Sequence, residues 1–415
     1  MKSLFDKRKL KYAASLNDES LTESTDPDFE LQYVDIGNVD SQGNIHELAV
    51  YPFKKAPSRA RRQVKHGDVI ISTVRTYLQA IAPIKEPEAN LIVSTGFAVV
   101  RPNSNILNDD YFKYAVRESR FLEEVEARSK GVSYPAINSS ELADIDISLP
   151  TIEIQKLIAD YLDRETTQID NLIAAKEQML TLLEEKREAL INHIFTRGLD
   201  TNTDLKPSGI AWLGEIPKSW EVRRGKYLFS QSSLPVRETD EIVTCFRDGQ
   251  VTLRKNRRED GFTNAVLELG YQGIRKGQLI LHSMDAFAGA IGISDSDGKC
   301  SPEYIICDPL FDGIDSQYYA LLLRVMALRG FIQAACTAVR ERAPRIRFSH
   351  LATMFLPLPP ISEQQAIVQT IEQEKDSTKD LVIALTDSIS LLKERRSALI
   401  TAAVTGQITL EDMKK

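Results

Sequence analysis

The 415-residue chain lacks the features that mark several classes of protein. It has no apolar run near the roughly 18 residues that a membrane-spanning helix needs, and its N-terminus, MKSLFDKRKLKY, is charged where a signal peptide is apolar. Its four cysteines, Cys245, Cys300, Cys307 and Cys336, form no C-x-x-C pair, so no zinc site or disulfide framework is predicted. We therefore expect a cytoplasmic protein without a membrane segment, with its thiols free and buried.

Catalytic signatures are also scarce. The five histidines offer no nucleophile and base at a recognisable spacing. The best candidate is the segment from Asp308 to Phe311, D-P-L-F, which resembles the D-P-P-F type motif of adenine methyltransferases. It lacks the second proline, and no glycine-rich loop for a methyl donor precedes it. We interpret it as a turn and keep a self-contained DNA adenine methyltransferase as an alternative.

Basic residues are concentrated locally although the net charge is −7. The segment from Lys54 to His66 holds six Lys or Arg and no acid, and its Pro and Ser predict a loop. RKNRR at 254–258 and RERAPRIR at 340–347 are the comparable segments of the second half. Arginine and lysine serve for phosphate and base-edge contacts. The predicted DNA-binding residues are Lys54, Lys55, Arg59, Arg61, Arg62, Lys65, Arg75, Arg128, Lys130, Arg254, Lys255, Arg257, Arg258, Arg340, Arg342, Arg345 and Arg347.

The alternative interpretation of each basic segment is a solvated loop on a protein-interaction scaffold that binds no DNA. Basic segments in both halves favour DNA binding, because arginine can contact both phosphates and base edges. Other parts of the sequence are also repeated. A shift of 209 residues, the separation of Ile152 and Ile361, places LPTIEIQKLIADYL over LPPISEQQAIVQTI without a gap. The same shift aligns LLEEKREALI at 182–191 with LLKERRSALI at 391–400. Two similar scaffolds therefore carry two divergent blocks.

Each divergent block has the pattern of a small α+β domain. Runs rich in Val, Ile, Tyr and Thr predict strands at 31–37, 68–74, 92–100, 278–284 and 303–307. One helical stretch is expected in each block, at 109–128 and at 316–336.

Each repeated region predicts a short helix, a polar break near Thr166 or Ser377, and a long helix with an apolar stripe at steps of three and four. Arg187 and Arg396 occupy the same step of the two stripes. Two matching stripes favour an antiparallel coiled coil between the copies. The predicted seam contains Ile173, Leu180, Leu183, Leu190, Ile194, Val382, Leu385, Ile389, Leu392 and Leu399.

Three motifs carry a resemblance to the specificity subunits of type I restriction-modification enzymes. They are WLGEIPKSWEV at Trp212, LPLPPISEQQAIV at Leu356 and LLKERRSALITAAVTGQI at Leu391, and the resemblance covers essentially the whole chain. One departure is that the first block begins at KRKLKY without its own W-L-G-x-I-P lead.

The resemblance implies two α+β target-recognition domains joined by two long helices in a pseudo-two-fold repeat. Each domain would read one half of a split, asymmetric site in double-stranded DNA, and the helical rod would set the gap. The chain itself would be non-catalytic and bind no cofactor or metal. Two methyltransferase subunits would dock on the repeated helices and use S-adenosylmethionine, and restriction and translocase subunits would use ATP and Mg²⁺.

The predicted boundaries follow the repeat. We expect a first recognition domain at 1–150, a helical region at 151–198, a linker at 199–211, a second recognition domain at 212–359, a second helical region at 360–408 and a tail at 409–415.

Overall fold

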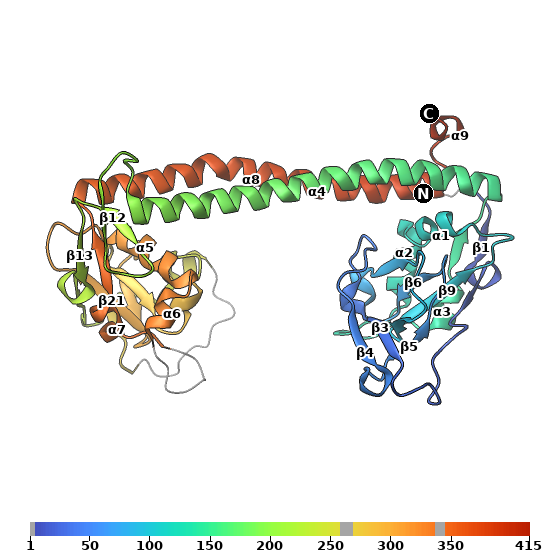
Figure 1. The fold of residues 1–415 in the computed structure, drawn as a ribbon, viewed down its shortest axis with the longest axis horizontal. Coiled ribbons are helices and arrows are strands. Elements are labelled where there is room, and N and C mark those ends of the chain that lie inside the picture. Colours follow the sequence, from blue (N-terminus) through green and yellow to red (C-terminus); the bar gives the residue numbers. More distant parts are fainter. Residues whose placement is uncertain (1–4, 258–268, 337–344) are drawn as a thin grey trace. The chain divides into compact units, whose positions relative to one another are not determined.

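The computed structural model describes residues 5–257, 269–336 and 345–415. The chain forms two compact units (Figure 1). Unit 1 comprises the chain up to residue 179 together with residues 384–415, and unit 2 comprises residues 180–383. Each unit contains one α+β head and parts of two long helices, α4 (Ile152–Arg197) and α8 (Ile361–Val404). Among the described residues, no helix is both long and apolar enough to span a bilayer.

The head of unit 1 is built on two four-stranded sheets, with strand orders β2-β9-β6-β7 and β4-β3-β8-β5. The first is antiparallel throughout, and the second contains one parallel pair, β3 with β8. The strands are β1 (Lys7–Lys9), β2 (Ala14–Leu16), β3 (Glu30–Val34), β4 (Ala49–Pro52), β5 (Ala60–Gln63), β6 (Val69–Ser72), β7 (Ile81–Pro83), β8 (Leu91–Ser94), β9 (Phe97–Pro102) and β10 (Asp146–Ser148). The helices of this head are α1 (Asp109–Ala115), α2 (Ser119–Arg128) and α3 (Ser139–Ala143).

Strand β6 lies at the centre of this head, and both of its faces are buried. Val69 and Ile71 pack into the cluster that contains residues of α1 and α2, whereas Ile70 packs into a second cluster with Val34 and Val93. Successive side chains of a strand point to opposite faces, so one apolar run joins two cores.

Three local predictions for this head were wrong in detail. The apolar run 92–100 is two strands of different sheets, β8 and β9, separated by a turn at Gly96. The helical stretch 109–128 is broken between α1 and α2, where Arg117 donates hydrogen bonds to the carbonyls of Gln42 (2.5 Å) and Ile81. The segment predicted as a basic loop contains strand β5, whose pairing with β8 outweighs the local turn signals.

The head of unit 2 has a four-stranded antiparallel sheet of order β14-β21-β18-β19 and four two-stranded pairs. Its strands are β11 (Leu205–Pro207), β12 (Glu215–Pro217), β13 (Glu221–Arg224), β14 (Phe229–Gln231), β15 (Val243–Cys245), β16 (Val251–Leu253), β17 (Gln272–Ile274), β18 (Leu279–His282), β19 (Ile291–Ile293), β20 (Gly298–Cys300), β21 (Tyr304–Pro309) and β22 (Phe355–Leu358). The predicted helix at 316–336 is two helices, α5 (Ser316–Leu328) and α6 (Phe331–Ala335), and α7 is Phe348–Thr353.

The two heads keep one strand arrangement with different polar partners. Strand β18 pairs with β21 as β6 pairs with β9. In unit 1 the fully buried Asp68 accepts two hydrogen bonds of 2.8 Å from Arg101. In unit 2 Gln278, at the matching position, donates to Asp308 at 2.8 Å. The fold is thus repeated while the residues that satisfy its buried polar groups differ.

The glutamine of the L-P-x-x-x-x-Q motif joins each long helix to its head. Gln155 is fully buried. Its side-chain oxygen accepts from the Asn108 N–H at 2.8 Å, and its amide nitrogen donates to the carbonyls of Ile106 (3.0 Å) and Pro150 (2.8 Å). One side chain therefore satisfies three backbone groups at the start of α4.

Gln364 makes the same three contacts at the start of α8. It accepts from the Asp315 N–H at 2.8 Å and donates to the carbonyls of Gly313 (2.9 Å) and Pro359 (2.8 Å). Because buried backbone groups must find partners, this glutamine fixes where the helix leaves the head in both units.

The W-L-G-x-I-P lead belongs to the core of unit 2. Leu213 and Trp220 are buried, and the Trp220 indole donates to Glu363 of α8 at 2.8 Å. In unit 1, Met413 of the short helix α9 (Leu410–Met413) is buried in the main apolar cluster. In Figure 1, α9 lies beside the long helices, on the side away from the head of unit 1.

The predicted polar breaks were wrong, since α4 and α8 are each continuous. The Thr166 hydroxyl donates to the Leu162 carbonyl at 2.6 Å, and the Ser377 hydroxyl donates to the Glu374 carbonyl at 3.0 Å. Both side chains bond to the preceding turn of their own helix, so they do not end it.

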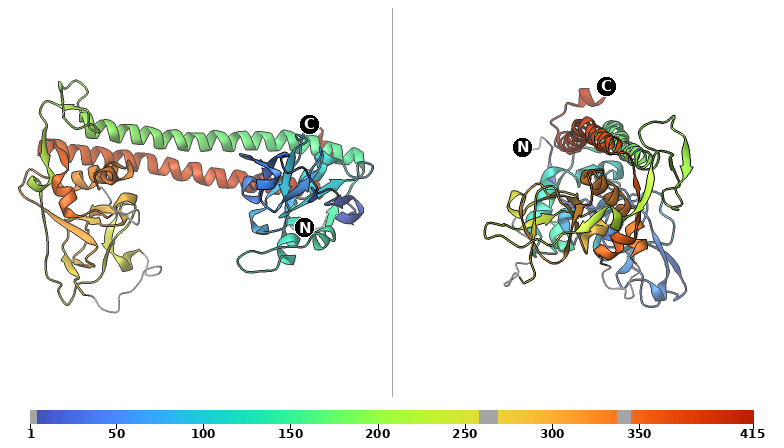
Figure 2. Two further views of the ribbon diagram at one scale, coloured as in Figure 1. Left: turned by 60° about the horizontal axis from the view of Figure 1, so that its bottom comes forward. Right: turned by 90° about the vertical axis from the view of Figure 1, so that its left-hand side faces the viewer.

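The long helices run antiparallel within each unit (Figures 1 and 2). In unit 1, Asp170 contacts Arg396 and Glu177 contacts Lys393, so the residue number rises along α4 as it falls along α8. In unit 2, Lys186 lies 3.4 Å from Glu374.

The stripe predicted for the seam is the less exposed face of both helices. Ile173, Ile194, Leu385 and Ile389 are buried. Val382 is an exception, with 39% of its surface exposed. The half-buried members are Leu180, Leu183, Leu190, Leu392 and Leu399.

Arg396 has a partner in the seam of unit 1. Its Nε lies 2.9 Å from Oδ1 of Asp170 and its Nη2 lies 3.2 Å from Oδ2, with the arginine side chain only 15% exposed. Such a two-pronged contact fixes geometry as well as charge. The arginine therefore specifies the register of α8 against α4.

We predict that replacing Gln364 by leucine lowers the free energy of unfolding of the full chain by about 2–4 kcal/mol, because three buried backbone groups lose their partner. Urea denaturation measures the change. The matched control is Gln365→Leu, at an exposed neighbouring position, which should stay within about 0.5 kcal/mol of wild type. Equal effects of the two changes would contradict the role of Gln364.

We predict that Asp170→Ala destabilises the chain by about 1–2 kcal/mol, since it leaves the Arg396 guanidinium without its carboxylate in a mostly buried seam. Thermal unfolding measures this loss. Glu177→Ala removes the exposed pair with Lys393 and should cost at most about 0.5 kcal/mol. A larger loss for Glu177→Ala than for Asp170→Ala would rule out the register role.

Candidate nucleic-acid interface

The basic segment of unit 1 lies on a 3-10 helix and an edge strand. Lys54 and Lys55 end the 3-10 helix η3 (Phe53–Lys55), and Arg61 and Arg62 are in β5, at the edge of its sheet. Arg59 lies exposed between these two elements. The lysines and Arg59 therefore point into solvent, whereas the two strand arginines are half-buried.

Several of these cations have acidic neighbours. The Nζ atom of Lys54 lies 2.5 Å from Asp28, and Lys65 forms an ion pair with Glu19. Arg61 lies 3.6 Å from Glu23 and stacks 4.8 Å from the centre of the Phe53 ring. The pairs of Lys54 and Lys65 are exposed and contribute little to stability. These two lysines can therefore exchange an acidic partner for another anion.

Arg62 differs from its neighbours because its Nε atom is buried and has no hydrogen-bond partner among the described residues. Burial lowers the pKa of this guanidinium below its ordinary value. A group in this state is better suited to holding β5 in place than to reaching a phosphate.

The other predicted residues of unit 1 lie near two loops. Arg75 is exposed, and its guanidinium lies 4.8 Å from the centre of the Tyr134 ring. Arg128 lies 2.9 Å from Glu124, and Lys130 lies 3.2 Å from Glu141.

In unit 2, Arg254 and Lys255 lie on the 3-10 helix η6 (Arg254–Asn256), which follows β16 as η3 follows β4. Arg254 donates from Nε to the Thr244 hydroxyl at 3.2 Å, and Lys255 forms an ion pair with Glu241. Arg258 lies outside the described residues.

Arg257 lies 2.7 Å from Asp248 and stacks 4.3 Å from the centre of the Phe246 ring. The hydrogen bond to the Asp248 carboxylate raises the pKa of Arg257, and the same contact lowers the pKa of Asp248. Arg257 is thus a fully charged, oriented guanidinium at the surface.

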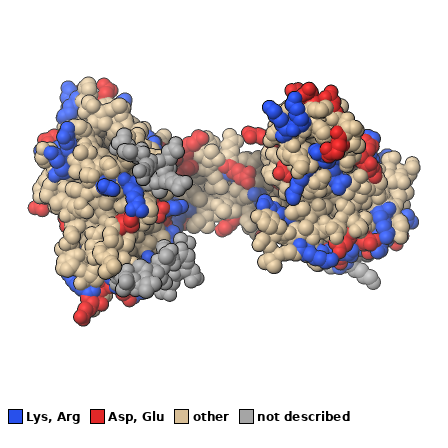
Figure 3. All heavy atoms as spheres, turned by 90° about the horizontal axis from the view of Figure 1, so that it is seen from below, with Lys and Arg blue, Asp and Glu red and all other residues tan. Residues whose placement is uncertain are grey.

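The third basic segment is described only in part. Arg345 lies 2.9 Å from Glu303, and Arg347 is exposed just before α7. Arg340 and Arg342 lie outside the described residues. On the face drawn in Figure 3, the Lys and Arg side chains of the described residues are scattered among Asp and Glu on both units.

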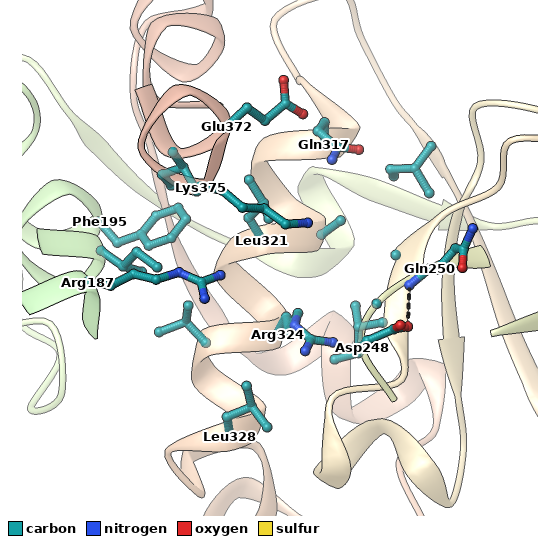
Figure 4. Close-up of a pocket in the computed structure, with 18 of the residues that line it drawn as sticks. Arg187, Phe195, Asp248, Gln250, Gln317, Leu321, Arg324, Leu328, Glu372 and Lys375 are labelled. Carbon is teal, nitrogen blue, oxygen red and sulfur yellow. Dashed lines mark hydrogen bonds between the residues drawn. The ribbon is translucent and has the colours of Figure 1, made fainter. Parts of the chain in front are cut away.

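Arg187, the second seam arginine, lines a cavity of about 820 Å³ in unit 2. Figure 4 shows Arg187 and Lys375 extending from the long helices toward Arg324 and Asp248 of the head. Arg324 donates to two backbone carbonyls of the head, each at 2.6 Å. This arginine was missed in the sequence because a single Arg in an apolar helix resembles a solvated residue.

Unit 1 has a smaller cavity of about 200 Å³ at the equivalent junction, lined by Arg117 and Arg396. Burial lowers the pKa of Arg117 to about 10. The two seam arginines therefore lie at matching places, each where a long helix meets a head arginine that holds backbone carbonyls.

The D-P-L-F segment has no catalytic geometry in the described structure. Asp308 is in β21 and accepts the Gln278 amide, while Leu310 and Phe311 are exposed. The described residues also hold no group of His, Cys, Asp and Glu side chains placed to bind a metal ion.

Comparison with known proteins finds similarity to one family model and to several specificity subunits of type I restriction enzymes. The model of the type I restriction modification DNA specificity domain matches residues 58–184. The EcoDI specificity subunit of Escherichia coli is 23% identical over 70% of this chain and 68% of its own length. The MjaVIII specificity subunit of Methanocaldococcus jannaschii is 23% identical over 78% of this chain and 75% of its own length. The MjaX specificity subunit of the same organism is 27% identical, but only 42% of its length is covered.

One solved structure shares the fold across nearly the whole chain. It comes from work on complex assembly and conformational transition of the type I R-M system, and it covers 98% of this chain and 100% of its own with a TM-score of 0.71 and 19% identity. These similarities confirm the resemblance carried by the sequence motifs. In its matched domain, its relatives and its fold, the chain is similar to the specificity subunits of type I restriction enzymes.

Proposed function

We propose that the chain is the non-catalytic, sequence-specific DNA-binding subunit of a type I restriction-modification complex. Each head reads one half of a bipartite, asymmetric site in double-stranded DNA. The observation that carries this proposal is the repeat itself. The two heads share a strand arrangement but differ in the residues that pair with their buried polar groups. Each head is joined to its long helix by an equivalent glutamine, Gln155 in unit 1 and Gln364 in unit 2.

The heads offer comparable but different basic elements to DNA. Each places cations on a 3-10 helix that follows a strand, Lys54 and Lys55 in η3 and Arg254 and Lys255 in η6. Each also holds an arginine on an aromatic ring, Arg61 in unit 1 and Arg257 in unit 2. Phosphate contacts position a protein on the duplex, whereas base contacts specify the sequence. Different residues on similar elements suit two different half-sites.

The repeated helices carry exposed apolar residues that suit two copies of one partner. Leu172 is 53% exposed and its repeat Leu381 is 43% exposed, while Leu182 and Leu391 are 53% and 64% exposed. The 209-residue shift relates the members of each pair, and Glu185 matches Glu394 in the same way. Because these leucines are exposed at matching positions of the repeat, they are candidates for equivalent contacts with two copies of one partner. Two methyltransferase subunits are the proposed occupants.

The chemistry of the complex resides in its other subunits. The methyltransferase subunits supply S-adenosylmethionine for adenine methylation, and restriction and translocase subunits use ATP and Mg²⁺. This chain contributes DNA recognition and the spacing of the two half-sites.

Methylome sequencing of a host that expresses the chain with a methyltransferase subunit should reveal one bipartite motif, with one methylated adenine in each half on opposite strands. The reason is that two unlike heads place two identical enzymes on an asymmetric site. The control strain lacks the chain and keeps the methyltransferase subunit. Methyl transfer by the purified chain alone would instead favour the self-contained enzyme.

Removing one heptad from both α4 and α8 should shorten the unread gap of this motif by about three base pairs, since seven residues of helix span about 10 Å and a base pair about 3.4 Å. The gap is read from the methylome of the variant. A matched variant with one extra heptad in each helix should lengthen the gap by a similar amount. A gap unchanged in both variants would contradict the spacing role of the helices.

A further inference from the structure

Two adjacent loops of unit 1 bring Arg75, one of the predicted DNA-binding residues, together with apolar residues that the sequence pattern did not indicate. The first contains Arg75 and the 3-10 helix η4 (Thr76–Leu78), and the second is the turn at residues 129–136. The Arg75 N–H donates to the Pro135 carbonyl at 2.7 Å, and the Thr76 hydroxyl contacts the Ser129 hydroxyl at 2.8 Å. The loops therefore hold each other in place.

The backbone of the first loop is strained at both ends of its 3-10 helix. Arg75 has φ 54° and Gln79 has φ 50°, and neither is a glycine. Residues other than glycine rarely adopt this left-handed backbone conformation, and those that do are concentrated at functional sites. In this case the strain fixes the direction in which the Arg75 side chain leaves the loop.

Four large apolar or aromatic side chains of these loops are exposed. Val132 is fully exposed, Tyr134 is 61% exposed, Tyr77 is 52% exposed and Leu78 is 40% exposed. The Arg75 guanidinium lies 4.8 Å from the centre of the Tyr134 ring. Neither loop contains an Asp or Glu.

We propose that Arg75, Tyr77, Leu78, Val132 and Tyr134 form a base-reading surface for double-stranded DNA. This inference rests on the proposed function and names the residues through which unit 1 reads its half-site. Tyr134 orients the Arg75 guanidinium, which can donate two hydrogen bonds to a guanine edge. Val132 and Leu78 are suited to contact thymine methyl groups. The absence of acidic side chains from both loops favours an anionic partner, and the proposed function identifies that partner as duplex DNA.

The test uses the full chain with its methyltransferase subunit and a duplex carrying the bipartite motif found by methylome sequencing. Val132→Asp places a negative charge at a fully exposed position, so it leaves folding intact and should weaken binding at least 10-fold. The matched control is Val50→Asp, at a 60% exposed position on β4, which should bind within about two-fold of wild type.

Arg75→Gly provides a second, independent readout. Glycine tolerates a positive φ, so the melting temperature should equal or exceed that of wild type, while binding falls about 10-fold and one half of the methylated motif loses specificity at a base pair. Wild-type affinity and an unchanged motif for both Val132→Asp and Arg75→Gly would overturn the proposal. Weaker binding with an unchanged motif would also overturn it, by assigning only phosphate contacts to the surface. Absence of any bipartite motif with the wild-type chain would instead refute the proposed function.

Discussion

The structure depends on the antiparallel packing of α4 against α8, because each head completes its core with a helix end from elsewhere in the sequence. In unit 1, Ile158 and Leu162 near the start of α4 share one apolar cluster with Ile400 and Val404 near the end of α8. In unit 2, Ile194 and Ile367 share the other main cluster. Burial of this apolar surface favours folding, and it requires residues about 240 positions apart in unit 1 to meet. Neither head is therefore independent of the repeat.

In the two units, the starts of the long helices are alike, whereas the loops and polar contacts of the heads differ. The helix starts are alike, since Gln155 and Gln364 satisfy the same three kinds of backbone group. The loops and polar contacts of the heads differ, as Asp68 with Arg101 and Gln278 with Asp308 illustrate. Under the proposed function, one repeated scaffold with two different surfaces would place two copies of one partner on an asymmetric DNA site. The cavities beside Arg187 and Arg396 lie at the junctions where scaffold and surface meet.

Sequence periodicity predicted the seam well and the heads less well, for physical reasons. A stripe such as Ile173, Ile194, Leu385 and Ile389 repeats at the helical period, so its burial follows from local geometry. The run 92–100 is apolar throughout, and nothing local shows that its two parts join different sheets. Thr166 predicts a break by its polarity, but its hydroxyl bonds back to the preceding turn and the helix continues. The structure that such a local sequence pattern forms therefore depends on contacts that are made only in the folded protein.

The repeat, the two long helices, the two unlike heads on like scaffolds and the resemblance to type I specificity subunits can all be predicted from the order of the residues. Those properties depend on residue order and period, which are visible without coordinates. Whether a cation is exposed, paired or buried depends on the fold, as Arg59, Arg257 and Arg62 show in turn. The fold also placed Arg75 beside Tyr134, because the loops that carry them are brought together by hydrogen bonds between residues distant in sequence.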